Sequence, residues 1–244
     1  MIKYKKTFLF SIAMLTALGI SACGGASDAG KATNTEVSST ASGNASGNTD
    51  TGSTNAGSTD GKVVQDVQYS YIEFDDLFEK MEAEDIDGNK VDSQIFKKAD
   101  VTMINIWGTF CSPCITEMPD IGEINRAYQT DTNSDGSLKF QVIGLVGDAL
   151  AADKDGNIYM DSNVVDKAKD IVEKTSADYL HIVPTGNFGI NLMGGGRISY
   201  FPSTIFVDKE GDIIETSEGE IVIGAHKRAD WEKLIKEVIK DEQD

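Results

Sequence analysis

The feature that most constrains this chain is a C-x-x-C pair, Cys111 and Cys114, placed between a predicted strand and a predicted helix. Residues 101–107 read VTMINIW, an apolar run of strand length, and Gly-Thr interrupts it at 108–109. Beyond the pair, apolar side chains recur at helical spacing, at Met118, Ile121, Ile124 and Tyr128. Pro113 suits the first turn of a helix, which has no N–H partner to lose. The expected order is therefore strand, turn, C-x-x-C, helix.

This placement favours redox chemistry over an inert bridge or half of a metal site. Cys111 would lie at a helix N-terminus, where the dipole and free N–H groups stabilise a thiolate. Cys114, one turn further in, would resolve a mixed disulfide. A bridge closing so short a loop removes little entropy from the unfolded chain. A structural zinc site needs four ligands, but there is no second cysteine pair, and neither His181 nor His226 has the matching spacing. We therefore expect no bound metal and no cofactor besides the redox-active disulfide itself.

Together with Trp107 before the pair and Pro119 after it, this pattern resembles the thioredoxin superfamily. Within it, the chain is most similar to the TlpA/ResA-like extracytoplasmic thiol–disulfide oxidoreductases. The resemblance implies an α/β thioredoxin-like fold over 62–244, with a mixed central β-sheet flanked by helices and an N-terminal β extension. A predicted amphipathic helix at 164–172 and an apolar segment at 179–183 match the central helix–strand insert of TlpA-like proteins.

A second segment, SYFPSTIFVDKEGDII at 199–214, extends the resemblance. It implies a cis peptide bond before Pro202, facing the C-x-x-C and leaving adjacent backbone groups free to pair with a bound peptide. A β-hairpin with its turn at 209–212 should follow. Phe110 stands where the family usually has tryptophan. The client-binding residues implied in this way are Trp107, Phe110, Ser112, Pro113, Phe201 and Pro202.

Resolution of the mixed disulfide requires a proton acceptor for Cys114. Plain thioredoxins carry a buried acid on the central strand, but the matching residue here is Asn105. The resemblance, through C-x-x-C-x-x-E-x-P, makes Glu117 the replacement acid, one helical turn past Cys114. A solvated glutamate with no role is the alternative. A nearby carboxylate should also raise the pKa of both thiols.

The N-terminal region predicts export. Residues 1–22 combine a lysine-rich start with a short apolar run, as a signal peptide does. The ISAC motif at 20–23 resembles a bacterial lipobox, so we expect lipidation of Cys23. Residues 23–61 are rich in Gly, Ser, Thr, Asn, Ala and Asp, a composition typical of a flexible linker. The expected location is the outer face of the cytoplasmic membrane.

Charge limits the partners. The chain has a net charge of −18, and loss of the three lysines in residues 1–22 would leave 19 basic against 40 acidic residues, or −21. This balance argues against nucleic-acid binding, which needs clustered Lys and Arg. Membrane attachment would then depend on the lipid at Cys23.

The leading hypothesis is a membrane-tethered, monomeric protein disulfide reductase. The resemblance implies a transmembrane thiol donor of the CcdA kind, and clients such as apocytochrome c or oxidised methionine sulfoxide reductase. An oxidase that donates its disulfide is the first alternative. A peroxiredoxin is disfavoured because P-x-x-x-T-x-x-C does not precede Cys111. A non-catalytic lipoprotein binding module is the last alternative.

Overall fold

The computed structural model describes residues 69–154 and 158–243, all of which belong to one compact unit, Ser58–Asp244. The predicted signal peptide, Cys23 and the predicted linker lie outside the described residues. Regular structure begins with a short hairpin and ends with a long helix. The elements are β1 (Glu82–Asp85), β2 (Lys90–Asp92), η1 (Ser93–Lys98), β3 (Ala99–Trp107), α1 (Ser112–Tyr128), β4 (Leu138–Val146), β5 (Leu150–Ala152), β6 (Ile158–Met160), α2 (Ser162–Thr175), β7 (Leu180–Pro184), α3 (Gly186–Gly189), η2 (Ile190–Gly194), β8 (Ser203–Asp208), β9 (Ile213–Ile214), β10 (Val222–Ile223) and α4 (Arg228–Gln243).

The main sheet has the strand order β10-β8-β3-β4-β7-β1-β2, with β9 paired to β8. Strands β3, β4 and β7 are parallel, whereas β8, β10, β1 and β2 run antiparallel to their neighbours. The predicted mixed sheet is confirmed. Parallel neighbours need long crossovers, and here α1 joins β3 to β4 while α2 lies in the connection from β4 to β7.

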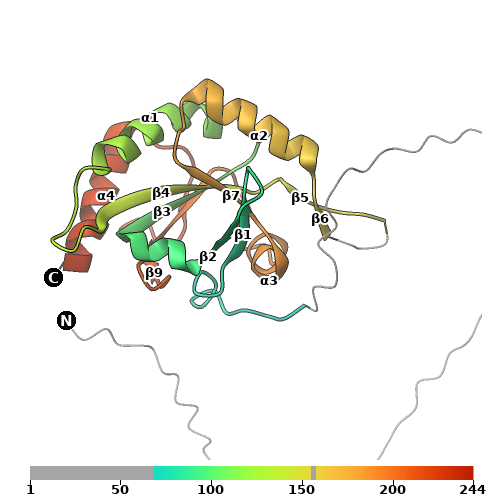
Figure 1. Ribbon diagram of the computed structural model, residues 1–244, viewed down its shortest axis with the longest axis horizontal. Coiled ribbons are helices and arrows are strands. Elements are labelled where there is room, and N and C mark those ends of the chain that lie inside the picture. Colours follow the sequence, from blue (N-terminus) through green and yellow to red (C-terminus); the bar gives the residue numbers. More distant parts are fainter. Residues whose placement is uncertain (1–68, 155–157, 244) are drawn as a thin grey trace, which may run out of the picture. The chain divides into compact units, whose positions relative to one another are not determined.

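Helices cover both faces of the sheet, so the strands that carry the site are buried on each side. Helices α1, α2 and α4 lie along one face, which we call the helical face, while α3 and η1 lie on the other (Figure 1). Along β3 the side chains alternate: Val101, Met103 and Trp107 join the core of the helical face, and Ile104 and Ile106 join the opposite core. This burial on both faces explains why 101–107 reads as a continuous apolar run.

The two features that distinguish the predicted fold from a plain thioredoxin are present. The N-terminal β extension is the β1–β2 hairpin, which adds to the sheet through the pairing of β1 with β7. The insert supplies α2 and β7, close to the predicted segments at 164–172 and 179–183. It also carries the separate β5–β6 hairpin, which the sequence pattern did not predict. The β8–β9 hairpin with its turn at 209–212 is confirmed.

Candidate active site

Cys111 caps the N-terminus of α1, as the spacing predicts. Its backbone is extended, and its Sγ accepts a hydrogen bond from the Cys114 N–H at 3.3 Å. Pro113 occupies the first helical turn, where it costs no backbone hydrogen bond. The two sulfurs are joined as a disulfide, with Cα atoms 5.3 Å apart. A thiolate on Cys111 would therefore face an N–H group and the positive end of the helix dipole.

The two cysteines differ in access to solvent. Cys111 is 6% exposed and Cys114 is fully buried. Ser112 and Pro113, between them, are exposed. The Cys111 side of the disulfide therefore borders the exposed residues Ser112 and Pro113, whereas Cys114 is enclosed by the protein.

The turn before Cys111 is held by an acid that sequence reasoning missed. The Asp148 carboxylate, just after β4, accepts hydrogen bonds from the Thr109 N–H at 3.0 and 3.1 Å and from the Thr109 hydroxyl at 2.8 Å. Thr109 is 5% exposed, so these bonds satisfy buried polar groups. They fix the chain two residues ahead of the nucleophile.

The Phe201–Pro202 peptide bond is cis. Phe110, which is 68% exposed, packs edge-on against Phe201 with ring centroids 5.8 Å apart. Phe201, the residue before this bond, therefore lies next to the segment that carries Cys111. Exposed Tyr200 continues the same loop.

The expectation of free backbone groups around the cis bond needs one correction. The Pro202 carbonyl already accepts a hydrogen bond from the Gly224 N–H at 2.9 Å. Proline has no N–H to offer. One lone pair of this carbonyl is therefore taken, so the expected pairing with a peptide falls chiefly to the Phe201 backbone.

The expectation that Trp107 contacts clients is wrong. Its side chain is fully buried, and its Nε1–H donates to His181 Nδ1 at 3.3 Å. Trp107 has the same strand parity as Val101 and Met103, and so it faces the core of the helical face. The alternation of side chains along a strand at 101–107 already predicts this inward orientation from the sequence.

Glu117 is buried beside the redox pair, contrary to the alternative of a solvated glutamate. It is 4% exposed and lies one helical turn past Cys114. Three donors surround its carboxylate: Asn105 Nδ2 contacts Oε1 at 3.1 Å, while the His226 N–H and Trp231 Nε1–H contact Oε2 at 3.0 and 3.4 Å. Burial raises the pKa of Glu117 to about 7, against the lowering effect of these hydrogen bonds.

Asn105 occupies the central-strand position predicted for it, facing Glu117. Its Nδ2 also donates to Thr204 Oγ1 at 3.3 Å, and its Oδ1 is buried without a hydrogen-bond partner among the described residues. An amide in this place cannot take up a proton, but it can present either a donor or an acceptor to Glu117 by rotating. Of these two facing side chains, only Glu117 can therefore take up a proton.

No cluster of three or more His, Cys, Asp or Glu side chains suited to a metal ion occurs within 69–154 and 158–243. Over the same residues, no helix has both the length and the apolar character needed to cross a bilayer.

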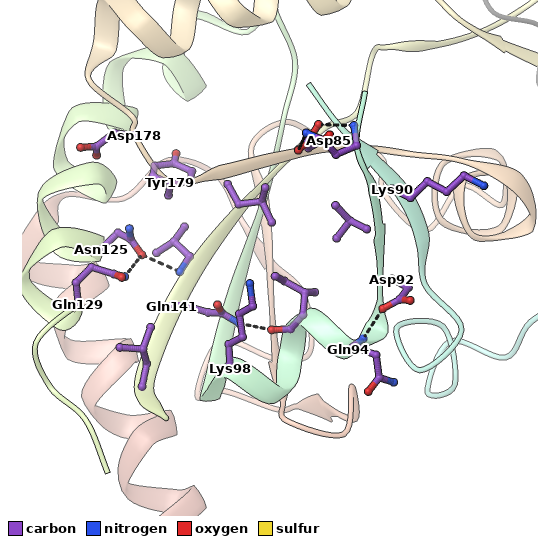
Figure 2. Close-up of a pocket in the computed structure, with 16 residues that line it drawn as sticks. Asp85, Lys90, Asp92, Gln94, Lys98, Asn125, Gln129, Gln141, Asp178 and Tyr179 are labelled. Atoms are coloured by element: carbon purple, nitrogen blue, oxygen red, sulfur yellow. Dashed lines mark hydrogen bonds between the residues drawn. The ribbon is translucent and has the colours of Figure 1, made fainter. Parts of the chain in front are cut away.

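A polar cavity of about 630 Å³ lies away from the cysteines. Its walls come from the end of α1, the β1–β2 hairpin, η1, β4 and the start of β7 (Figure 2). Several of its amides are already bonded within the protein: Asn125 Oδ1 accepts from the Val142 N–H, and Gln141 Nε2 donates to the Ile95 carbonyl. None of its lining residues belongs to the cysteine site.

Comparison with known proteins agrees with this geometry. Residues 60–235 match the profile of the Redoxin family, which covers more than half of the chain. The chain belongs to the Redoxin family. The thioredoxin-like fold expected from the sequence, a mixed sheet flanked by helices, is thereby confirmed.

Curated relatives of this Redoxin chain include two proteins named thiol-disulfide oxidoreductase ResA. The one from Bacillus thuringiensis subsp. konkukian is 26% identical over 137 residues, covering 56% of this chain and 64% of the relative. The one from Bacillus anthracis is 24% identical over 155 residues, covering 63% of this chain and 72% of the relative. The chain thus spans slightly less than two thirds of the first relative's length. The expected resemblance to ResA-like proteins is confirmed.

Solved structures similar to this Redoxin chain include a thioredoxin-family thiol:disulfide interchange protein from Chlorobium tepidum. It is 18% identical with a TM-score of 0.47, over 66% of this chain and 94% of the other. A secreted thiol-disulfide isomerase from Corynebacterium glutamicum is 20% identical with a TM-score of 0.47, over 66% and 84%.

Proposed function

We propose that this protein is an extracytoplasmic thiol–disulfide oxidoreductase that reduces protein disulfides through the Cys111–Cys114 couple. The observation that carries the proposal is the grouping of a helix-capping Cys111, a resolving Cys114 and a buried acid, Glu117, beside the cis-proline segment at Pro202. The names of the ResA relatives support the same class of activity.

In the first step, the Cys111 thiolate attacks one sulfur of a client disulfide. The client S–S bond breaks, a Cys111–client disulfide forms, and the other client sulfur leaves as a thiolate that takes a proton. Ser112, Pro113, Phe110 and the Phe201–Pro202 segment border the approach to Cys111 and are the proposed client contacts.

In the second step, Cys114 attacks Cys111 and releases the second client thiol. Cys114 must first lose its proton, and Glu117 accepts it, because a carboxyl group with a pKa of about 7 is an effective base near neutral pH. The client gains two electrons and two protons in total, and the Cys111–Cys114 disulfide re-forms.

Turnover requires two electrons from outside the protein. We assign this role to a transmembrane dithiol donor of the CcdA kind, which would reduce the Cys111–Cys114 disulfide by the same exchange chemistry. Lipidation at Cys23 would hold the domain at the outer face of the cytoplasmic membrane, within reach of such a donor. No metal or cofactor enters this scheme.

Insulin reduction with dithiothreitol as electron source tests the activity. The wild-type protein should accelerate it, and Cys111→Ser should be inactive, with Cys114→Ser accumulating a mixed disulfide. Equal rates for wild type and Cys111→Ser would reject the proposal in favour of a binding module.

The reduction potential of the couple tests the direction. A reductase should have a potential well below that of strong oxidants such as DsbA, about −120 mV. A value near that figure would show a disulfide donor instead. A hydroperoxide-dependent loss of Cys111 thiol faster than disulfide exchange would indicate a peroxidase.

A further inference from the structure

The loop between β10 and α4 contacts both parts of the proposed site. The Gly224 N–H donates to the Pro202 carbonyl at 2.9 Å, and the His226 N–H donates to Glu117 Oε2 at 3.0 Å. One residue separates these two donors. The cis-proline segment and the buried acid, although on different elements, are therefore joined through one short piece of backbone.

The His226 side chain fixes the conformation of this loop. One ring nitrogen, Nδ1, lies 2.9 Å from the Gly224 carbonyl, and the other, Nε2, lies 3.0 Å from Glu218 Oε2. The ring also stacks on Trp231, with centroids 4.5 Å apart and planes at 36°. Trp231 in turn donates to the same Glu117 oxygen at 3.4 Å. The imidazole thus supports both donors to Oε2.

Both acceptors around the ring are oxygen atoms that can only receive a hydrogen bond. A neutral imidazole has one N–H, so it can satisfy either Gly224 O or Glu218, whereas the imidazolium satisfies both. The side chain of His226 is only 15% exposed, while that of Glu218 is 44% exposed. The ring is therefore held between a backbone carbonyl inside the loop and a carboxylate at the surface.

The backbone of the loop depends on glycine at its first position. Gly224 has φ +96°, a conformation that other residues adopt only with strain. That conformation lets the Gly224 N–H contact Pro202 while its carbonyl contacts the ring. The contact with Glu117 thus depends on a turn whose conformation requires glycine at position 224.

The structure assigns His226 a positioning role. Its ring is anchored on the Gly224 carbonyl and on Glu218. In this way it holds the 224–226 loop so that the His226 N–H contacts Glu117 and the Gly224 N–H contacts the Pro202 carbonyl. This inference rests on the proposed function, in which Glu117 is the proton acceptor. Because Glu117 Oε2 receives both supporting donors, the loop sets how strongly the ionised carboxylate is stabilised.

The groups that donate hydrogen bonds to Glu117 come from three elements: Asn105 on β3, Trp231 on α4 and His226 in the loop. The charge of Glu117 also acts on Tyr179, before β7, although no hydrogen bond joins these two described residues. The His226 N–H and the charge of its ring lower the pKa of Glu117, against the larger effect of burial. Glu117 in turn helps to raise the pKa of Tyr179, after desolvation. Glu218 faces the His226 ring, and Glu117 accepts a hydrogen bond from the His226 backbone N–H.

The test is a direct titration of Glu117 in the oxidised protein, by the ¹³C shift of its carboxyl carbon after glutamate labelling. Its signal is assigned by its loss in Glu117→Gln. His226→Ala should raise the midpoint by about one pH unit, because a hydrogen bond to the charged form is weakened. His226→Gln, which retains a donor, should restore part of the shift.

Glu218→Gln tests the same anchor without altering the loop itself, and it should raise the midpoint by a smaller amount in the same direction. The matched control is Glu237→Gln, because Glu237 binds Ser217, the neighbour of Glu218, without contacting His226. This control should leave the midpoint unchanged. Wild-type midpoints in both His226→Ala and Glu218→Gln would overturn the inference.

The titration needs no turnover, so the two proposals can fail separately. An unshifted midpoint in a protein that reduces insulin would reject only the role of His226. A shifted midpoint in an inactive protein would keep the role of the loop and reject the reductase.

Discussion

Glu117 and His181 are both buried on the helical face of the sheet, and burial shifts their pKa values in opposite directions. Burial raises the pKa of Glu117 to about 7 and lowers that of His181 to about 4. His181 has both ring nitrogens occupied, by the Trp107 N–H at Nδ1 and the Ala177 carbonyl at Nε2. Its ring therefore carries its proton on Nε2 and stays neutral near pH 7.

The comparison separates the proposed proton acceptor, Glu117, from a structural residue, His181. Desolvation moves the pKa of Glu117 toward the working pH, where a base can both gain and lose a proton. The same desolvation moves the pKa of His181 away from it. His181 is therefore a neutral packing residue with satisfied hydrogen bonds, although its residue type is the one more often found in proton transfer.

The largest expected effect comes from crowding His181. A Cβ added at Gly144 would lie 2.2 Å from His181 Nδ1, so Gly144→Ala must displace the ring. We expect a loss of about 3 kcal/mol or more in unfolding free energy, measured by urea denaturation. Gly194→Ala is the control, because its added Cβ would meet only Ile190 at 3.7 Å. Similar losses in both variants would show that His181 is not tightly packed.

The two groups should also give opposite dependences of stability on pH. The folded pKa of Glu117 is raised from 4.5, so its favourable contribution is complete below pH 4.5 and is lost as pH rises through 7. The loss is about 3 kcal/mol. The difference in unfolding free energy between wild type and Glu117→Gln should change by this amount between pH 4 and 8, measured by urea denaturation, because the opposite contribution of His181 is common to both proteins. A difference that stays constant over this range would mean that Glu117 ionises normally in the folded state.

For His181 the sign is reversed. Its folded pKa is lowered from 6.5, so its contribution is complete above pH 6.5 and is lost as pH falls through 4, by about 3 kcal/mol. His181→Gln should remove this loss at acid pH. If acid stability is the same in the variant and the wild type, the ring is not held neutral.

Replacing Glu117 should also have a large effect on the rate of thiol–disulfide exchange. Glu117→Gln should slow release of the client from the mixed disulfide about 10²-fold near pH 7, measured by stopped flow. The fold should be retained, because Asn105 can rotate and present its Oδ1 to the new amide. Glu123→Gln is the control on the same helix, since Glu123 pairs with Arg228 at the surface. Unchanged exchange rates from pH 6 to 9 would remove Glu117 from the mechanism.

The smallest expected effect tests the corrected role of Trp107. Trp107→Phe keeps an aromatic ring but removes the hydrogen bond to His181, so stability should fall by about 1 kcal/mol. Insulin reduction should retain its KM, because the side chain does not reach the surface. A raised KM with unchanged stability would restore Trp107 as a client contact.

Short-range patterns predicted much of the site. The strand, the helix start at Cys111 and the position of Glu117 relative to Cys114 all follow from residue types and spacing within about one segment. The cis bond at Pro202 required the family resemblance, because proline alone is compatible with an edge strand or a loop. Trp107 was misassigned because its place beside the cysteines was given more weight than its parity in the strand.

The remaining contacts join distant parts of the sequence. Asp148 reaches Thr109 across 39 residues, and His226 and Trp231 reach Glu117 across 109 and 114 residues. Neither hydrophobic periodicity nor a short sequence motif predicts contacts between residues so far apart in the chain. The partners that set the pKa of Glu117 could therefore be found only once the loop before α4 had been placed against α1.

Both tryptophans of the chain, Trp107 and Trp231, pack in the same core layer as Cys111 and Cys114. Opening the bridge would change the surroundings of the layer that holds both indole rings, and we expect the tryptophan emission to change with it. The opposite layer carries no competing indole. The tryptophan emission would then follow the oxidation state of the Cys111–Cys114 couple, so the two proposed half-reactions could be timed without a label.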